Sequence, residues 1–315
     1  MTSGAGKYLL SGASGMLGTA LRQALAGREL PVLQLVRGRE SSTGQLRWDP
    51  DASPALADSE ALEGLTAAIH LSGASVAGHR WNAAYKREMT ESRVGTTHAL
   101  ASALARLRQP PKALLVASAT GYYGNRGDEL LDETSAAGSG FLADLCRQWE
   151  AAAQPAVDAG IRVVHLRFGV VLGAGRGALS RMAPLFRLGL GGPLGSGRQW
   201  MSWISLADLV AAILLVLDTP ALSGPVNLTT PAPVTNAEFT QALAHELGRP
   251  AFLTAPAFAL RLALGQMADE ALLASARVYP SKLTTAGFQF KYPTVAQALA
   301  AAFGSPQPSP PPALS

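Results

Sequence analysis

Short apolar runs, almost free of polar residues, recur along the chain between longer segments of helical spacing. Apolar runs without polar alternation are typical of strands that are buried on both faces of a parallel sheet. Five runs of this kind predict buried strands: Val32–Val36, Ala67–Leu71, Leu114–Ala117, Val163–Leu166 and Val226–Leu228.

The segments between these runs carry helical patterns. Apolar residues recur at helical spacing in Trp81–Leu107 and in Phe141–Ala159, each of which lies between two predicted strands. Strands that alternate with helices predict a succession of βαβ units with right-handed crossovers. We therefore expect an α/β fold, namely a Rossmann-type doubly wound parallel sheet.

The C-terminal part of the chain follows a different pattern. The alternation becomes less regular after Asn227, and Asn236–Leu247 and Ala257–Leu273 have helical spacing. A length of 315 residues suits about two domains. We predict a cofactor-binding domain over 1–230 with a glycine-rich substrate loop at 174–204. A smaller C-terminal substrate or cap domain would follow over 231–303, and a disordered Pro-rich tail over 304–315.

Composition narrows the class of protein. The chain is 48% hydrophobic and 15% charged, with a net charge of +4 and no run of Lys or Arg, so no nucleic-acid partner is predicted. The single cysteine, Cys146, excludes an internal disulfide and fits a reducing compartment. The apolar run Leu209–Leu217 is much shorter than the roughly 20 residues of a membrane span. We expect a cytoplasmic protein without membrane association, and the sequence leaves its oligomeric state open.

A glycine-rich turn near the N-terminus carries the first chemical signal. The turn follows the apolar run Tyr8–Leu10 and precedes the helical pattern Thr19–Leu25. In such a strand–turn–helix unit the first glycine makes the tight turn, the second lets the backbone approach a pyrophosphate, and the third lets the helix pack on the strand. The free N–H groups of the helix N-terminus attract the phosphates. The predicted dinucleotide-binding residues are Gly12, Ser14, Gly15, Met16, Leu17 and Gly18.

The residue after the second predicted strand indicates which dinucleotide is bound. NAD-selective sites usually place a carboxylate there to bind the ribose 2′-hydroxyl, whereas an arginine accommodates the 2′-phosphate of NADP. This chain has Arg37, with Arg39 nearby, and its nearest acidic residue is Glu40. A guanidinium can bind a phosphate through two hydrogen bonds. We predict NADP(H) as the cofactor; the alternative is that Arg37 is a solvated loop charge.

Longer segments resemble a known family. From Lys7 to about Leu299 the chain is similar to atypical extended short-chain dehydrogenases/reductases, and in particular to the NADP-binding "epimerase family" group within the NAD-dependent epimerase/dehydratase superfamily. The resemblance rests on Arg80-Trp81-Asn82, Ser92-Arg93-Val94, Ser118–Gly124, Cys146 with Trp149-Glu150, Arg167–Gly173, Pro184–Gly192, Gly195–Trp200 and Pro233–Phe239.

The resemblance implies further cofactor contacts. Leu71, Ser72 and Gly73 would line the cofactor after the strand that ends near Leu71, Glu88 and Arg93 would approach the dinucleotide from the next helix, and Val170 would lie near the nicotinamide. Ordinary strand-end packing is an equally good explanation of Leu71 and Val170. An exposed helix salt bridge, which stabilises a protein little, is the alternative for Glu88 and Arg93.

The catalytic pair typical of the superfamily is absent. Active members use a tyrosine as acid and base and a lysine four residues later that lowers the tyrosine pKa. Here Cys146 falls at the tyrosine position and Glu150 at the lysine position. A carboxylate has the wrong sign to stabilise a thiolate or a phenolate. We interpret Cys146 as a buried helical cysteine.

Replacement catalytic groups are sought after the strand at Leu114–Ala117. We predict Ser118 and Tyr122 as catalytic, although core packing is the alternative for Tyr122. Arg198 and Trp200 in the glycine-rich loop suit an anionic or sugar-like small molecule. The five histidines have no metal-like spacing, so no metal site is predicted.

These patterns predict an NADP(H)-dependent oxidoreductase or epimerase-like enzyme that lacks the usual Tyr–Lys pair. Its substrate would be a carbonyl or hydroxyl compound or a molecule like a sugar nucleotide. The alternative is a non-catalytic NADP(H)-binding or redox-sensing protein.

Overall fold

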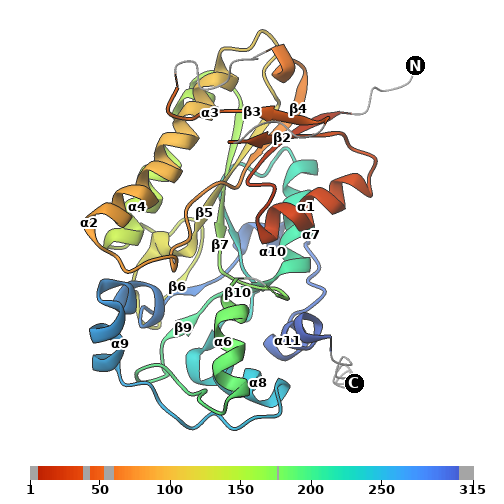
Figure 1. Ribbon diagram of the computed structural model, residues 1–315. Coiled ribbons are helices and arrows are strands. Elements are labelled where there is room, and N and C mark those ends of the chain that lie inside the picture. Colours follow the sequence, from red (N-terminus) through yellow and green to blue (C-terminus); the bar gives the residue numbers. More distant parts are fainter. Residues whose placement is uncertain (1–5, 38–42, 53–59, 176, 305–315) are drawn as a thin grey trace.

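A seven-stranded parallel sheet forms the centre of the described chain (Figure 1). The computed structural model describes residues 6–37, 43–52, 60–175 and 177–304; Arg39, Glu40 and the predicted Pro-rich tail beyond Gly304 lie outside these residues. The strand order is β11-β7-β5-β4-β1-β2-β3. These strands are β1 (Lys7–Ser11), β2 (Val32–Val36), β3 (Gln45–Arg47), β4 (Leu65–His70), β5 (Ala113–Ala119), β7 (Arg162–Phe168) and β11 (Gly224–Leu228). The predicted Rossmann-type doubly wound sheet is confirmed.

The order of the strands locates the site. The chain leaves β1 toward β2 and β3 on one side, then crosses back to place β4 on the other side of β1. The chain after β1 enters α1 (Met16–Ala26) on one face of the sheet, and the chain after β4 leads to α3 (Thr96–Ala105) on the other face. Such a switch point leaves a crevice outside the carboxyl ends of the strands, which is the ligand-binding position in open α/β sheets. In the sequence, the glycine-rich turn follows β1 directly.

Helices cover both faces of the sheet. They are α1 (Met16–Ala26), α2 (Ala83–Thr90), α3 (Thr96–Ala105), α4 (Phe141–Ala151), α5 (Gln154–Asp158), α7 (Leu206–Asp218) and α10 (Ser281–Thr285). A π-helical turn at Glu91–Gly95 joins α2 to α3, so the helical pattern predicted over Trp81–Leu107 is one interrupted helix. Pro155 at the start of α5 separates α5 from α4 within the second predicted segment.

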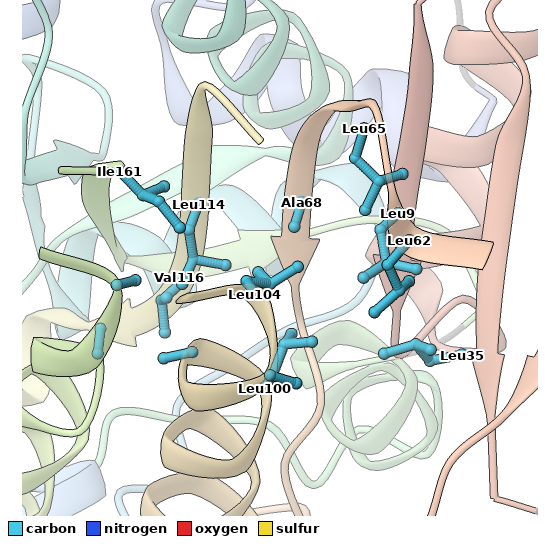
Figure 2. Close-up of a cluster of buried hydrophobic side chains, with 14 of the residues drawn as sticks. Leu9, Leu35, Leu62, Leu65, Ala68, Leu100, Leu104, Leu114, Val116 and Ile161 are labelled. Atoms are coloured by element: carbon cyan, nitrogen blue, oxygen red, sulfur yellow. The ribbon is translucent and has the colours of Figure 1, made fainter. Parts of the chain in front are cut away.

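The two core layers explain the apolar strands. Leu9 packs with Leu100 and Leu104 of α3, whereas its neighbour Leu10 packs with Leu21 of α1 on the opposite face. All five side chains are at most 1% exposed. Figure 2 shows the first of these layers, with Leu100 and Leu104 among the strand side chains. Each fully buried leucine contributes roughly 1.5–3 kcal/mol to the hydrophobic driving force for folding.

A group of shorter elements lies beyond one end of the sheet (Figure 1). They are β6 (Leu130–Leu131), β8 (Val170–Leu172), α6 (Ala178–Arg187), β9 (Trp200–Met201), β10 (Trp203–Ser205), β12 (Val234–Thr235), α8 (Asn236–Glu246), α9 (Ala257–Leu264), β13 (Arg277–Val278) and α11 (Val295–Phe303). Five of these elements, β8, α6, β10, α8 and α11, share a core that joins Leu172 and Trp203 to Phe239 and Leu299. This core draws on residues from both sides of position 230, and the domain boundary predicted there stays a prediction.

Two helices were not placed correctly by the sequence patterns. The segment Ala257–Leu273 is not one helix, because Gly265 adopts a φ of +62° and ends α9 before a π-helical turn at Ala268–Leu272. Helix α6 lies inside the predicted substrate loop at 174–204. Within the described ranges, no helix combines the length and apolarity needed to cross a membrane.

Candidate cofactor and substrate site

Two glycines of the first turn are required by contacts within the chain. Gly12 has a φ of +69°, and a β-carbon there would lie 2.9 Å from the carbonyl carbon and oxygen of Leu71. A β-carbon at Gly18 would lie 2.2 Å from the carbonyl oxygen of Gly12. Both positions therefore exclude larger residues even without a ligand, because they let β1, β4 and α1 approach closely.

Gly15 is different, because little in the chain itself requires a glycine there. Its φ of −70° suits any residue, and a β-carbon would meet only the Gly12 carbonyl oxygen at 3.4 Å. Gly15 is also the N-cap of α1, where no side chain of the described residues caps the helix and no acidic residue lies in the first turn. The first backbone N–H groups of α1 thus remain for an external anion. This open cradle fits a dinucleotide pyrophosphate.

The other residues of the turn have distinct surroundings. Ser14 is exposed beside Gly15, whereas Leu17 packs into the core beneath α1. The Met16 sulfur lies near Gly173 and Gly177, so its side chain reaches toward the segment after β8. The first residue of α1 therefore lies beside the segment that follows β8.

A buried polar network holds the crevice between β1 and β4. The Ser11 hydroxyl lies 2.6 Å from Nδ1 of His70, and Nε2 of His70 lies 3.1 Å from the Thr96 hydroxyl. The Leu71 amide donates to Ser11 Oγ at 3.1 Å. Burial lowers the pKa of His70 to about 4, so the ring is neutral at physiological pH. The network fixes the start of the predicted cofactor segment, Leu71-Ser72-Gly73.

Arg93 packs directly on that segment. A β-carbon at Gly73 would lie 3.3 Å from Cζ of Arg93, and the guanidinium donates to the carbonyl oxygens of Ala74 and Met89 at 2.8 and 3.1 Å. The same guanidinium lies over the Trp149 ring at 5.0 Å. Glu88, by contrast, is on the exposed face of α2. Of this predicted pair, only Arg93 is buried beside the crevice.

Arg37 lies at the edge of the sheet that carries the glycine turn. It follows β2 directly and is exposed. Strand β2 pairs with β1 in parallel, with Leu35 opposite Ser11. The carboxyl ends of both strands thus point to the same edge, which is the arrangement expected for a residue that contacts the far end of the dinucleotide.

A cavity of about 390 Å³ opens at the carboxyl ends of β5 and β7. Its walls come from the ends of those strands, from α4, from the 190s loop and from the π-helical turn at Ala268–Leu272. The predicted cofactor residue Val170 lines it. Thr120, Trp200 and Gln199 line it as well, whereas Ser118 and Tyr122 do not. Sequence reasoning chose Ser118 within Ser118-Ala119-Thr120, but Thr120 is the hydroxyl residue of this run that reaches the cavity.

The C-terminal wall of the cavity is attached to α4 by one carboxylate. Glu270 accepts hydrogen bonds from the backbone N–H groups of Phe141 and Leu142, at 3.1 and 2.8 Å. These are the first residues of α4, so the carboxylate caps the helix and meets the positive end of its dipole. A β-carbon at Gly140 would come within 3.1 Å of this carboxylate. Glu270 was not predicted from the sequence.

Ser118 belongs to a buried ion-pair network. Its hydroxyl donates to Glu150 Oε1 at 2.7 Å, and Arg167 binds both oxygens of the same carboxylate at 2.8 Å. The side chains of Arg167 and Glu150 are 3% and 12% exposed. The glutamate that replaces the family lysine is therefore neutralised by an arginine of β7.

The two tyrosines of the predicted catalytic segment contact the same arginine. Cζ of Arg167 lies 3.5 Å from the ring centroid of Tyr122, and its Nη1 donates to the Tyr123 hydroxyl at 3.0 Å. The Tyr123 hydroxyl donates in turn to Asn227 Oδ1 at 2.7 Å. Burial raises the pKa of the Tyr123 phenol to about 12. That Ser118 and Tyr122 are catalytic stays a prediction.

Cys146 is expected to resist thiol reagents in the folded protein. It is 4% exposed, and burial together with the neighbouring Glu150 carboxylate raises the pKa of its thiol to about 11. At pH 8 only about one thiol in a thousand would then be ionised. Titration with an aromatic disulfide should show no reaction in buffer and one thiol in 6 M guanidinium chloride. Rapid labelling of the native protein would contradict this prediction.

Comparisons with known proteins agree with this architecture. The model of the NAD dependent epimerase/dehydratase family matches residues 8–228, and a domain of unknown function, DUF1731, matches residues 255–302. The chain is 47% identical to the epimerase family protein Mb2239 of Mycobacterium bovis, over 92% of this chain and 95% of that protein.

Two of the similar solved structures are more than one third identical in sequence to this chain. The human epimerase family protein SDR39U1 with NADPH is 36% identical, with a TM-score of 0.85 over 94% of this chain and 98% of that one. The nucleoside-diphosphate sugar epimerase from Corynebacterium glutamicum is 35% identical, with a TM-score of 0.80 over 96% of this chain and 59% of that one. This chain belongs to the NAD dependent epimerase/dehydratase family, in the group of epimerase family proteins that includes SDR39U1.

Proposed function

We propose that the protein binds NADP(H) and uses it as an oxidoreductase or epimerase on a small carbonyl or hydroxyl compound. One observation carries the proposal: the uncapped N-terminus of α1 at Gly15 lies at the β1/β4 switch point, and a cavity opens at the carboxyl ends of β5 and β7 in the same sheet. The NADPH in the human SDR39U1 structure supports the choice of cofactor.

The proposal assigns different roles to the residues around the cavity. When bound, NADPH would supply the hydride that reduces a carbonyl carbon, and the carbonyl oxygen would take a proton from water. Val170 and Thr120 both line the cavity, where Val170 would contact the nicotinamide and Thr120 would offer its hydroxyl to the substrate. The proposal gives Ser118 and Tyr122 positioning roles in place of the catalytic roles predicted from the sequence, because their contacts with Glu150 and Arg167 fix the end of β5 from which Thr120 extends.

Arg37→Ala is expected to weaken NADPH binding by about tenfold to a hundredfold and to leave NADH binding unchanged. The guanidinium is proposed to bind the 2′-phosphate, which NADH lacks, and charge-assisted hydrogen bonds contribute roughly 1.5–3 kcal/mol. Calorimetric titration of both cofactors into both proteins measures the difference. Tighter binding of NADH than of NADPH by the wild-type protein, unaltered in Arg37→Ala, would refute the cofactor assignment.

The rival is a non-catalytic NADP(H)-binding protein, which the absence of the usual Tyr–Lys pair favours. NADPH consumption is the discriminating measurement. Turnover of carbonyl compounds that survives Cys146→Ala and falls in Thr120→Ala supports the enzyme. Tight NADPH binding without consumption, across carbonyl and sugar-nucleotide panels, supports the rival. The burial of Cys146 argues against the redox-sensing form of that rival.

A further inference from the structure

The charge of the cavity walls bears on the class of substrate. Among the described residues that line the cavity, the charged side chains are the carboxylates Asp269 and Glu270, and no lysine or arginine lines it. Asp269 is paired with Arg261 at 2.8 Å on the protein exterior, where both side chains are about half exposed. Glu270 is engaged by the α4 N-terminus. The described part of the walls therefore offers no lysine or arginine to a phosphate.

The arginines close to the glycine-rich loop do not add a positive charge to the cavity walls. Arg198, which the sequence suggested as an anion-binding residue, is exposed and does not line the cavity. Cζ of Arg277 lies 4.5 Å from the centroid of the Trp200 ring, and Arg277 does not line the cavity either. Trp203, the second tryptophan of this region, is fully buried and donates to the Ala232 carbonyl oxygen.

Several polar side chains of the walls form hydrogen bonds with backbone groups of the neighbouring loops. Ser202 donates to the Ala276 carbonyl oxygen at 2.8 Å, and the Gln199 amide donates to the carbonyl oxygens of Leu194 and Leu272. Asn236 accepts from the Leu194 amide, and Asn125 accepts from the Ser275 amide. These bonds hold the cavity in shape and use part of the polar capacity that a sugar would need.

The remaining surface is largely apolar. The apolar residues that line the cavity include Leu142 of α4, Phe168 at the end of β7, Val170 at the start of β8, Met182 of α6, Met201 of β9 and Leu272 of the π-helical turn. A volume of about 390 Å³ is near the lower end of the range for small-molecule sites.

We infer that this cavity takes a neutral, predominantly apolar carbonyl compound rather than a nucleoside-diphosphate sugar. That the ligand is a carbonyl compound rests on the function proposed above, whereas its neutrality and apolarity rest on the walls alone. A diphosphate would lose its hydration beside two carboxylates, with no cation among the described wall residues to compensate, and burial of an unpaired charge is strongly unfavourable. An apolar ligand instead gains free energy from each part of its surface that the walls cover.

Nile red, a neutral apolar dye, tests the inference in the apo protein and in the NADPH-saturated protein. The dye should bind with increased fluorescence, 2-decanone should displace it, and UDP-glucose should not. Met182→Arg, which places a cation in the cavity, should weaken dye binding at least about tenfold. Leu185→Arg is the matched control, because Leu185 lies on the same helix, is 52% exposed and does not line the cavity.

The outcomes separate the two proposals. Displacement of the dye by UDP-glucose, or dye binding that Met182→Arg leaves unchanged, overturns the inference about the cavity. If the wild-type protein does not bind NADPH in the calorimetric titration, the proposed cofactor is wrong. The inference about the cavity still stands in that case, because dye binding is also measured without cofactor.

Discussion

Gly15→Asp is expected to abolish NADPH binding without destabilising the protein. Aspartate is among the best N-cap residues, and the φ of −70° and ψ of 170° at Gly15 suit it without strain. A carboxylate there would accept hydrogen bonds from the first N–H groups of α1 and would repel the pyrophosphate from the same groups. The substitution should therefore stabilise the helix and weaken NADPH binding. This combination distinguishes a glycine that is needed for ligand binding from one that is needed for folding.

The expected loss of NADPH affinity is at least about a hundredfold, equivalent to roughly 2.7 kcal/mol. Calorimetry gives the affinity, and the melting temperature of the apo protein gives the stability, which should be equal to or slightly above that of the wild type. Gly18→Ala should show the opposite pattern, namely a lower melting temperature of the apo protein with NADPH binding retained by the folded protein. Its β-carbon would lie 2.2 Å from the Gly12 carbonyl oxygen. Gly95→Ala is the neutral control, since no atom lies within 4 Å of its β-carbon position. If the Gly15→Asp protein binds NADPH as tightly as the wild type, the pyrophosphate does not bind at the N-terminus of α1.

The sheet could be predicted because its signal is local. Each buried strand needs apolar residues on both faces, so the runs at Val32–Val36 and Leu114–Ala117 coincide with β2 and the centre of β5. The glycine turn could be found for the same reason, because strand, turn and helix are consecutive. Close contacts then account for Gly12 and Gly18.

The outer elements could not be predicted from local patterns. Strands β8, β9, β10 and β12 have only two or three residues each and exist through pairing with distant partners, such as Val234 opposite Met201. Periodicity over two or three residues carries no information. Helix α6 has an amphipathic pattern that glycines at both ends obscured.

The chemistry of the site depends on pairings across the sequence. Glu150 looked like a charge of the wrong sign, and only the fold places Arg167 of β7 against it. Thr120 and Ser118 could not be distinguished, because the end of β5 at Ala119 decides which hydroxyl reaches the cavity. Glu270 comes from a segment more than a hundred residues away from the helix that it caps. Local patterns therefore suffice to predict the residues of the cofactor side, whereas the contacts of the residues around the cavity follow only from the fold.

Restoring the family pair by Cys146→Tyr with Glu150→Lys is expected to destabilise the protein severely. Glu150→Lys removes the carboxylate that binds Arg167 through two hydrogen bonds and Ser118 through one, and it places a second cation beside a guanidinium that is 3% exposed. Breaking a buried ion pair on one side typically costs about 3–5 kcal/mol. Urea unfolding of the single variant Glu150→Lys should show a loss of at least this size.

The matched control lies on the same helix. Asp144 pairs with Arg147 on the surface, and its side chain is 50% exposed, so Asp144→Lys should cost no more than about 1 kcal/mol. The charge swap Glu150→Lys with Arg167→Glu should recover part of the loss, because it restores opposite charges at the buried site. Equal stability of Glu150→Lys and the wild type would show that the Glu150–Arg167 pair does not hold the end of β5. The expected loss of stability would instead mean that a lysine cannot replace Glu150 unless Arg167 is changed as well, because the two side chains form one buried ion pair.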